Sequence, residues 1–140
     1  MAKDRFISTA VVPERALLLG IDRKDATWPV DRSLDELERL AETAGAETVG
    51  RITQRLDRPI PKSYIGSGKV EELKGMVARL DVDVVIFDDD LSPSQQSYLE
   101  KSVGSPVKII DRTALILDIF GLHARTREGR LQVQLAQLQY

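Results

Sequence analysis

The sequence contains no cysteine and a single histidine, His123. Without cysteine, the chain has no disulfide scaffold and no thiolate metal site, and we expect a cytoplasmic protein because this composition suits a reducing compartment. His123 has no obvious catalytic partner in the sequence, so neither a Ser-His-Asp arrangement nor a histidine-based metal site is supported. At 140 residues, the chain is long enough to bury the core of one domain.

Long apolar runs are also missing from the chain. No segment approaches the roughly 20 apolar residues that a helix needs to cross a bilayer. The charged opening at residues 1–5 does not resemble a signal peptide. We therefore expect no membrane span.

The chain lacks a strong net charge of either sign. A formal charge of −2 argues against a protein that is basic over its whole surface. However, residues 46–80 contain seven basic and four acidic residues, and residues 112–140 contain four and two, whereas residues 81–111 contain two and seven. An RNA-facing side remains possible if the two basic segments meet in space.

Apolar stretches of strand length alternate with helical patterns along the chain. Residues 15–22 form a continuous apolar run, typical of a strand covered on both faces. Further strands are expected at 47–55, 82–87 and 107–110, and helices at 34–44, 69–80, from 93 and from 112. This order predicts an α/β fold, with a mostly parallel four-stranded sheet flanked by helices.

Three of the predicted helices begin with residues suited to capping. Ser33 with Glu36, and Ser92 with Gln95, have the spacing of a capping box. Asp111 stands where its carboxylate can accept hydrogen bonds from the first free N–H groups of the last helix. We expect these three positions to mark helix starts.

The last thirty residues predict two helices around a hinge, the start of a coiled-coil helical arm. The first helix should be buried, because its apolar residues recur at three- and four-residue intervals: Leu115, Ile116, Ile119, Phe120 and Leu122. In the second, Leu131, Leu135 and Leu138 form a narrow seam suited to one partner helix. We divide the chain into a leader (1–14), an α/β domain (15–123), and a hinge with the truncated first helix of a helical-hairpin subdomain (124–140).

Several long segments of the sequence resemble the N-terminal region of HflX, a ribosome-binding GTPase of the TRAFAC class. With x for positions that carry no resemblance, they are RPxPxxYIGSGKVEEL at 58–73, VIFDDDLSPSQ at 85–95, DRTxLILDIF at 111–120 and ARTREGxLQVxLAQL at 124–138. The resemblance covers roughly residues 15–140. It implies an N-terminal domain cut inside its helical subdomain, ahead of the GTP-binding domain.

The resemblance also implies a function for the parent protein. Such a protein binds the large ribosomal subunit and its RNA, hydrolyses GTP with magnesium, and helps to split or rescue stalled ribosomes. This chain should not itself hydrolyse GTP, since it has no G-x-x-x-x-G-K-[ST] loop and no candidate catalytic residue. The partners expected are the large subunit with its RNA and the GTP-binding domain of the same parent. ATP binding by this region is a further property credited to the family.

Gly66, Ser67, Gly68 and Lys69 are candidates for phosphate binding. They open a predicted helix, where glycine allows close backbone approach and the helix N-terminus favours anions. The spacing differs from that of a Walker A loop, because Ser63 stands where its first glycine should be and Val70 where Ser or Thr should ligate magnesium. A tight turn is the alternative interpretation.

Asp88, Asp89 and Asp90 follow a predicted strand, at the end where parallel sheets place ligands. Three carboxylates could hold magnesium. Adjacent residues on an extended chain point in different directions, however, so they converge poorly on one ion. We favour a structural or solvated role and predict no metal site.

Basic side chains give the best candidates for a ribosome contact. The first group lies at the hinge: Arg125, Thr126, Arg127 and Arg130. Arginine forms forked hydrogen bonds with phosphate, although these residues could instead pair with Glu128 or fix the hinge. The second group lies in the second predicted strand and the segment after it, and the direction its side chains share is not given by the sequence: Arg51, Arg55, Arg58 and Lys62.

Two other functional classes stay open on the sequence alone. One is a small ATP-binding α/β domain that uses the segments 66–69 and 88–90. The other is a protein-interaction domain that uses the seam from Leu131 to Leu138. The same unpartnered seam could produce a homodimer of this chain.

Overall fold

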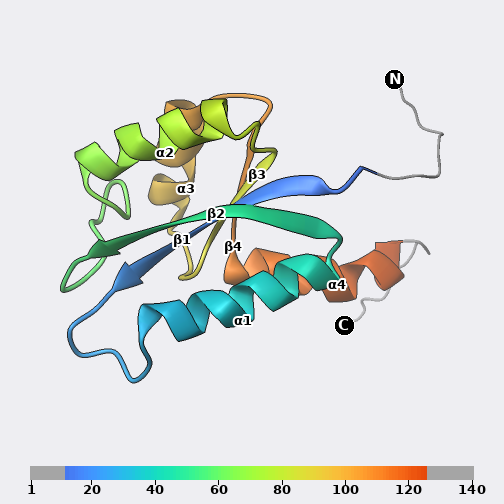
Figure 1. Cartoon of the computed structure of the whole chain (residues 1–140), viewed down its shortest axis with the longest axis horizontal. Coiled ribbons are helices and arrows are strands. Elements are labelled where there is room, and N and C mark those ends of the chain that lie inside the picture. The colour runs from blue at the N-terminus through green and yellow to red at the C-terminus, as the bar shows by residue number, and fades with distance from the viewer. Residues whose placement is uncertain (1–11, 126–140) are drawn as a thin grey trace.

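Residues 12–125 are described in the computed structural model, and within them four strands alternate with four helices (Figure 1). The α/β prediction is confirmed. In chain order, the elements are β1 (Glu14–Asp22), α1 (Val30–Thr43), β2 (Ala46–Arg55), α2 (Ser67–Arg79), β3 (Val84–Phe87), α3 (Pro93–Val103), β4 (Lys108–Asp111) and α4 (Arg112–Arg125).

The strands form one sheet in the order β2-β1-β3-β4, and every neighbouring pair is parallel. All four strands therefore end at the same edge of the sheet. The chain moves outward from β1 to β2, returns to the other side of β1 for β3, and then continues to β4. The direction of winding reverses between β1 and β3, so the loops that follow these two strands diverge.

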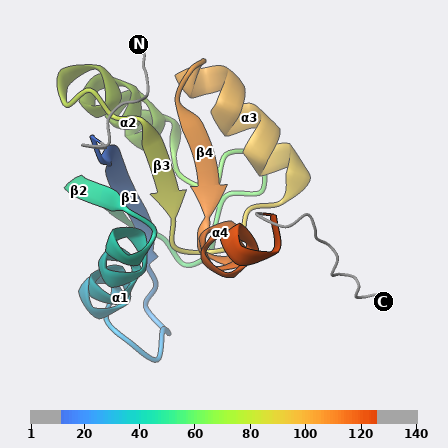
Figure 2. The same ribbon diagram turned by 90° about the vertical axis from the view of Figure 1, so that its right-hand side faces the viewer.

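Helices cover both faces of the sheet (Figure 2), which explains the continuous apolar run of β1. Leu17 and Leu19 point into a core that they share with the α2 residues Val70 and Leu73. The alternate residues of β1 face the other way. There, Leu18 joins a second core made with α1 and α4. Alternation of side chains along the strand thus divides the interior into two layers.

The predicted capping box at Ser33 is wrong. Helix α1 begins four residues before the predicted start, at Val30, and Pro29 occupies the N-cap without a side-chain hydrogen bond. The amide N–H groups of Arg32 and Ser33 both donate to the carbonyl oxygen of Pro29. Ser33 is therefore inside the helix, and its hydroxyl donates to Asp88 instead.

The other two caps are confirmed. The Ser92 hydroxyl accepts from the Gln95 amide, and the Gln95 side chain accepts from the Ser92 amide, which completes a capping box at the start of α3. Asp111 Oδ1 accepts from the amide of Ala114 in the first turn of α4, at 2.9 Å. The other carboxylate oxygen of Asp111 accepts from the Leu91 amide, so this residue also anchors the loop before α3.

The expectation that the apolar helix after Asp111 is buried is correct only for one side of α4. Leu115 is buried, whereas Leu117 and Phe120 are 64% and 71% exposed. Helix α4 lies beside α1, over β3 and the edge strand β4, so among residues 12–125 only one of its faces is covered. The helix extends through Arg125. The predicted arm at residues 126–140 lies outside the described residues, as does most of the leader.

Candidate functional site

A cleft of about 430 Å³ opens where the loops after β1 and β3 diverge. Open parallel sheets place ligands at this reversal, outside the carboxyl ends of the strands. The cleft is lined by residues of the β1–α1 loop, the first turn of α1 and the end of β3: Ile21, Arg23, Asp25, Ala26, Thr27, Trp28, Val30, Ser33, Asp88 and Asp89. The structure thus assembles a site from segments more than 50 residues apart.

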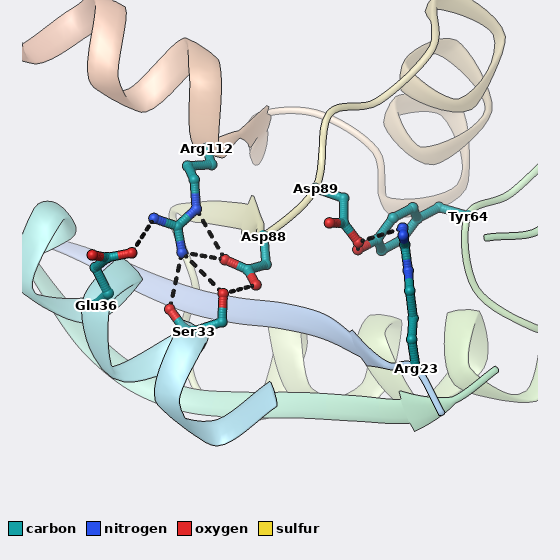
Figure 3. Close-up of polar contacts among 7 residues, drawn as sticks. All are labelled: Arg23, Ser33, Glu36, Tyr64, Asp88, Asp89 and Arg112. Carbon is teal, nitrogen blue, oxygen red and sulfur yellow. Dashed lines mark hydrogen bonds and ion pairs between the residues drawn. The ribbon is translucent and has the colours of Figure 1, made fainter. Parts of the chain in front are cut away.

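Arg112, the first residue of α4, is the centre of a polar network behind the cleft (Figure 3). Its Nε and Nη2 atoms donate to Asp88 Oδ1 at 3.1 and 2.6 Å. Its Nη1 donates to Glu36 of α1 at 3.0 Å, and Nη2 also donates to the Ser33 carbonyl oxygen at 3.0 Å. The Ser33 hydroxyl donates to the second oxygen of Asp88 at 2.5 Å. The network joins α1, the end of β3 and α4.

Arg112 is the one cation of this network and pairs with two carboxylates, those of Asp88 and Glu36. Burial lowers the pKa of Arg112, but its hydrogen bonds and attraction to Asp88 and Glu36 outweigh burial and hold the pKa above the ordinary value. Arg112 therefore stays charged. Both oxygens of Asp88 are occupied by donors, so this carboxylate has little capacity left for a ligand.

Asp89 turns toward the opposite side of the cleft. One of its oxygens, Oδ2, accepts from the Tyr64 hydroxyl at 2.6 Å and from Arg23 Nη2 at 3.3 Å. Tyr64 is fully buried, and its ring meets Phe87 edge to face at 5.3 Å. Burial and the neighbouring carboxylate raise the pKa of Tyr64 well above its ordinary value, so its hydroxyl remains a donor. The described contacts leave the Oδ1 atom of Asp89 available.

The Asp90 side chain points in a third direction, where it accepts a hydrogen bond from Thr113 Oγ1 at 2.5 Å. The three consecutive aspartates therefore bind different sets of partners and do not converge on one point. Among residues 12–125, no group of three or more His, Asp or Glu side chains is arranged to hold a metal ion. The geometry favours the structural role for Asp88 and Asp90, and it leaves Asp89 at the cleft.

The segment from Gly66 to Lys69 forms the turn into α2. Gly66 is the N-cap, and its amide donates to Gln54 Oε1 at 2.8 Å. A Cβ at Gly66 would lie 2.9 Å from the side-chain amide nitrogen of Gln54, so a larger residue here would require the end of the Gln54 side chain to move. Lys69 pairs with Glu72 at 3.1 Å. These contacts account for the segment as a turn, and its binding of phosphate stays a prediction.

The structure separates the basic candidates between residues 51 and 62 into two groups. Arg51 lies within β2 and forms ion pairs with Asp35 and Glu38 of α1. Its charge therefore holds α1 against β2, and Arg51 does not belong with the other three residues. Both hydrogen bonds raise the pKa of Arg51. Arg55, Arg58 and Lys62 are exposed on the strand end and loop that follow. We call these three residues the basic loop.

The hinge candidates are mostly beyond the described residues. Arg125 is the last residue of α4, and its side chain is not described. Thr126, Arg127 and Arg130 lie outside residues 12–125, as do Leu131, Leu135 and Leu138. Their proposed roles stay predictions.

Trp28, Tyr64 and Arg112 were missed as site residues by sequence reasoning. Trp28 is 55% exposed and lines the cleft. Arg112 and Asp88 follow neighbouring parallel strands, and opposite charges at adjacent strand ends could have indicated their pairing. The indication in the sequence that Trp28 is part of a site was weaker: it is a large aromatic residue in an otherwise polar connection.

Residues 31–121 match the family model described as GTP-binding GTPase N-terminal. The GTPase HflX of Lacrimispora saccharolytica is 45% identical over 138 residues, covering 96% of this chain and 31% of that protein. The GTPase HflX of Escherichia coli K12 is 46% identical over 107 residues, covering 76% and 25%. The chain therefore spans about 30% of the length of the first of these relatives.

Solved structures share the fold. A GTP-binding protein from the archaeon Sulfolobus solfataricus in complex with GDP has a TM-score of 0.59 and 22% sequence identity, covering 79% of this chain and 31% of that chain. A second GDP complex, of the protein called SsGBP, has a TM-score of 0.61 at 22% identity, covering 79% and 30%. Within residues 12–125, no helix combines the length and apolar character needed to span a membrane.

Proposed function

Because this chain belongs to the GTP-binding GTPase N-terminal family and corresponds to the N-terminal region of HflX GTPases, we propose that it is a docking region for ribosomal RNA. In this proposal it binds the large ribosomal subunit and supports the splitting or rescue of ribosomes by its parent. Ribosomes lie in the cytoplasm, so we place the protein there.

The observation that carries this proposal is the position of the basic loop. The last residue of β1, Asp22, pairs in register with Arg55, the last residue of β2. The chain continues from Arg55 into an irregular segment that exposes Arg58 and Lys62. The Arg55 side chain is 71% exposed and is 3.9 Å from Asp22, a distance at which pairing in water is weak. These cations are therefore available to phosphate groups.

The hinge arginines would supply a second contact. Arg125 ends α4, and Arg127 and Arg130 follow within five residues. Forked guanidinium groups suit the phosphates of RNA. We propose that they act together with the basic loop.

Hydrolysis of GTP is assigned to the parent rather than to this chain. The chain spans about 30% of its curated relatives, and its only glycine-rich turn before a lysine lacks the Walker A spacing. We propose that GTP and magnesium bind in the part of the parent that this chain does not cover, in a GTP-binding domain that is also a partner of this region. GTP turnover by the purified chain above a buffer blank would contradict this assignment.

ATP binding is the weaker alternative. Its segments at 66–69 and 88–90 are both present at the carboxyl edge, but the Gly66 amide is bonded to Gln54 and both oxygens of Asp88 have donors. A nucleotide with magnesium would have to displace these contacts. Isothermal titration with ATP and magnesium tests this alternative directly.

The proposal is tested by co-sedimentation of the chain with large ribosomal subunits at several salt concentrations. Replacing Arg55, Arg58 and Lys62 together by alanine should weaken binding. Each lost phosphate contact removes counterion release, so the slope of log affinity against log salt should fall by roughly 2 to 3 if all three contact RNA.

A matched control removes three cations elsewhere. Lys74 and Arg79 of α2 and Lys101 of α3 are exposed and lie away from the basic loop, toward the other edge of the sheet. Alanine at these three positions gives the same change in net charge. The proposal is overturned if the basic-loop variant binds like the wild type, or if the control loses as much affinity and salt dependence.

A further inference from the structure

Trp28 stands at the mouth of the cleft with one side of its ring already occupied. The Arg32 guanidinium lies over the ring, with its carbon 4.0 Å from the ring centroid. Despite this contact, Trp28 remains 55% exposed. Trp28 lines the 430 Å³ cleft, whose walls do not include Arg32, and also a smaller hollow of about 230 Å³ that does include Arg32. The ring thus stands between a cation and an open cleft.

We propose that Trp28 and this cleft form a stacking site for one unpaired RNA base that carries an amino group. The inference rests on the proposed RNA docking and adds a base-contacting residue to it. Single-stranded RNA is bound by aromatic rings that stack on its bases, combined with cations that contact its backbone. Trp28 supplies the aromatic ring, and the polar residues around it in the cleft supply groups that can form hydrogen bonds with a base.

The cleft has the hydrogen-bonding groups to hold the edge of a base. Asp89 Oδ1 has no donor among the described residues, because Tyr64 and Arg23 both donate to Oδ2. Asp25 is exposed and has no partner in the described part of the chain, and Thr27 lies beside it. Carboxylates only accept hydrogen bonds, so they favour bases with N–H₂ groups, guanine above all, over uracil.

Two cations that could contact the RNA backbone lie within four residues of Trp28 in the sequence. Lys24 and Arg32 are exposed, and neither pairs with a carboxylate within residues 12–125. The cleft wall is mainly polar, and Trp28 is its only aromatic residue. A protein hot spot would instead be expected to present several apolar side chains around the aromatic anchor. The combination therefore fits RNA better than a protein partner.

The test uses intrinsic fluorescence, because Trp28 is the only tryptophan in the sequence. The whole chain is titrated with a hexauridylate RNA and with the same RNA carrying one central guanosine. We expect the guanosine RNA to quench Trp28 fluorescence and to bind more tightly than hexauridylate. Trp28→Ala should weaken binding of a labelled guanosine RNA by roughly 5- to 150-fold, the range for loss of one stacked base.

Three variants separate stacking from other effects. Trp28→Phe keeps an aromatic face and should retain most of the affinity. Asp25→Asn should reduce the preference for guanosine over uridine, since its amide also donates. Phe120→Ala removes another exposed aromatic residue, on α4 and not among the residues that line the cleft, and should leave RNA affinity unchanged.

The outcomes distinguish this inference from the RNA docking on which it rests. If RNA or large subunits bind through the basic loop while Trp28 fluorescence and the affinity of Trp28→Ala do not change, the stacking site is refuted and docking stands. If guanosine monophosphate quenches as well as the RNA does, and the RNA binds no more tightly, the cleft is a free-nucleotide site and the assignment to RNA is overturned. If neither RNA nor subunits bind by any readout, both proposals fail.

Discussion

Replacing Arg112 by methionine should destabilise the fold through Asp88. The Arg112 side chain is 21% exposed and that of Asp88 is 11% exposed, and they meet at 2.6 Å. Methionine keeps an unbranched apolar stem but removes the charge and all donors. Asp88 is then left with the Ser33 hydroxyl as its remaining side-chain donor, in a place that water reaches poorly.

The size of the effect lies between two known limits. Breaking a fully buried ion pair by removing one partner costs about 3–5 kcal/mol, whereas a surface pair contributes about 0–1 kcal/mol. The low exposure of both side chains places this pair nearer the first limit, and we expect a loss of about 2–4 kcal/mol. For a domain of this length, such a loss lowers the melting temperature by roughly 6–14 °C.

The assay is urea denaturation followed by circular dichroism, with Arg55→Met as the matched control. The Arg55 side chain is 71% exposed and 3.9 Å from Asp22, so its replacement should cost less than about 0.5 kcal/mol. A double-mutant cycle with Asp88→Asn should show a coupling of roughly 1–3 kcal/mol. The reasoning is refuted if Arg112→Met is no more destabilising than Arg55→Met, or if the cycle shows no coupling.

Three further predictions concern single contacts. Tyr64→Phe keeps the ring packing but leaves Asp89 without its buried donor, so it should lower the free energy of unfolding by about 1–2 kcal/mol; equal stability in urea would show that the hydrogen bond contributes nothing. Ser92→Ala removes the cap of α3 and should cost about 1 kcal/mol, measured by thermal unfolding; an unchanged transition would contradict the capping role. In sedimentation equilibrium, the chain should dimerise at high concentration and a Leu131→Ser, Leu135→Ser variant should not; a wild-type chain that stays monomeric would rule out the dimer.

Local features of the sequence were enough to determine the class of the fold. The apolar run of β1 predicted a strand covered on both faces, and both of its faces are covered. The Ser92 capping box and the Asp111 cap were also predicted correctly. These predictions depend on residues within four positions of one another, whose preferences survive in the folded chain.

The failures have a common physical cause. Ser33 has a correct cap spacing, but its hydroxyl bonds to Asp88, 55 residues away, and α1 starts at Val30 instead. Helix α4 has a buried pattern, yet Leu117 and Phe120 are exposed because residues 12–125 pack against only one face of α4. In each case a distant neighbour, or its absence, outweighed the local preference.

The candidate site was decided by the tertiary structure alone. Periodicity identifies strands but does not give their order, and only the placement of β3 beside β1 creates the cleft next to Trp28. The same order brings Arg112 to Asp88 across 24 residues and Tyr64 to Asp89 across 25. The sequence by itself determined the strands and most of the helices, because these depend on local pattern. It also determined the family, because several long segments match the family's sequence. Which side chains meet at the carboxyl edge depends on strand order, and strand order is fixed by the packing of the whole domain.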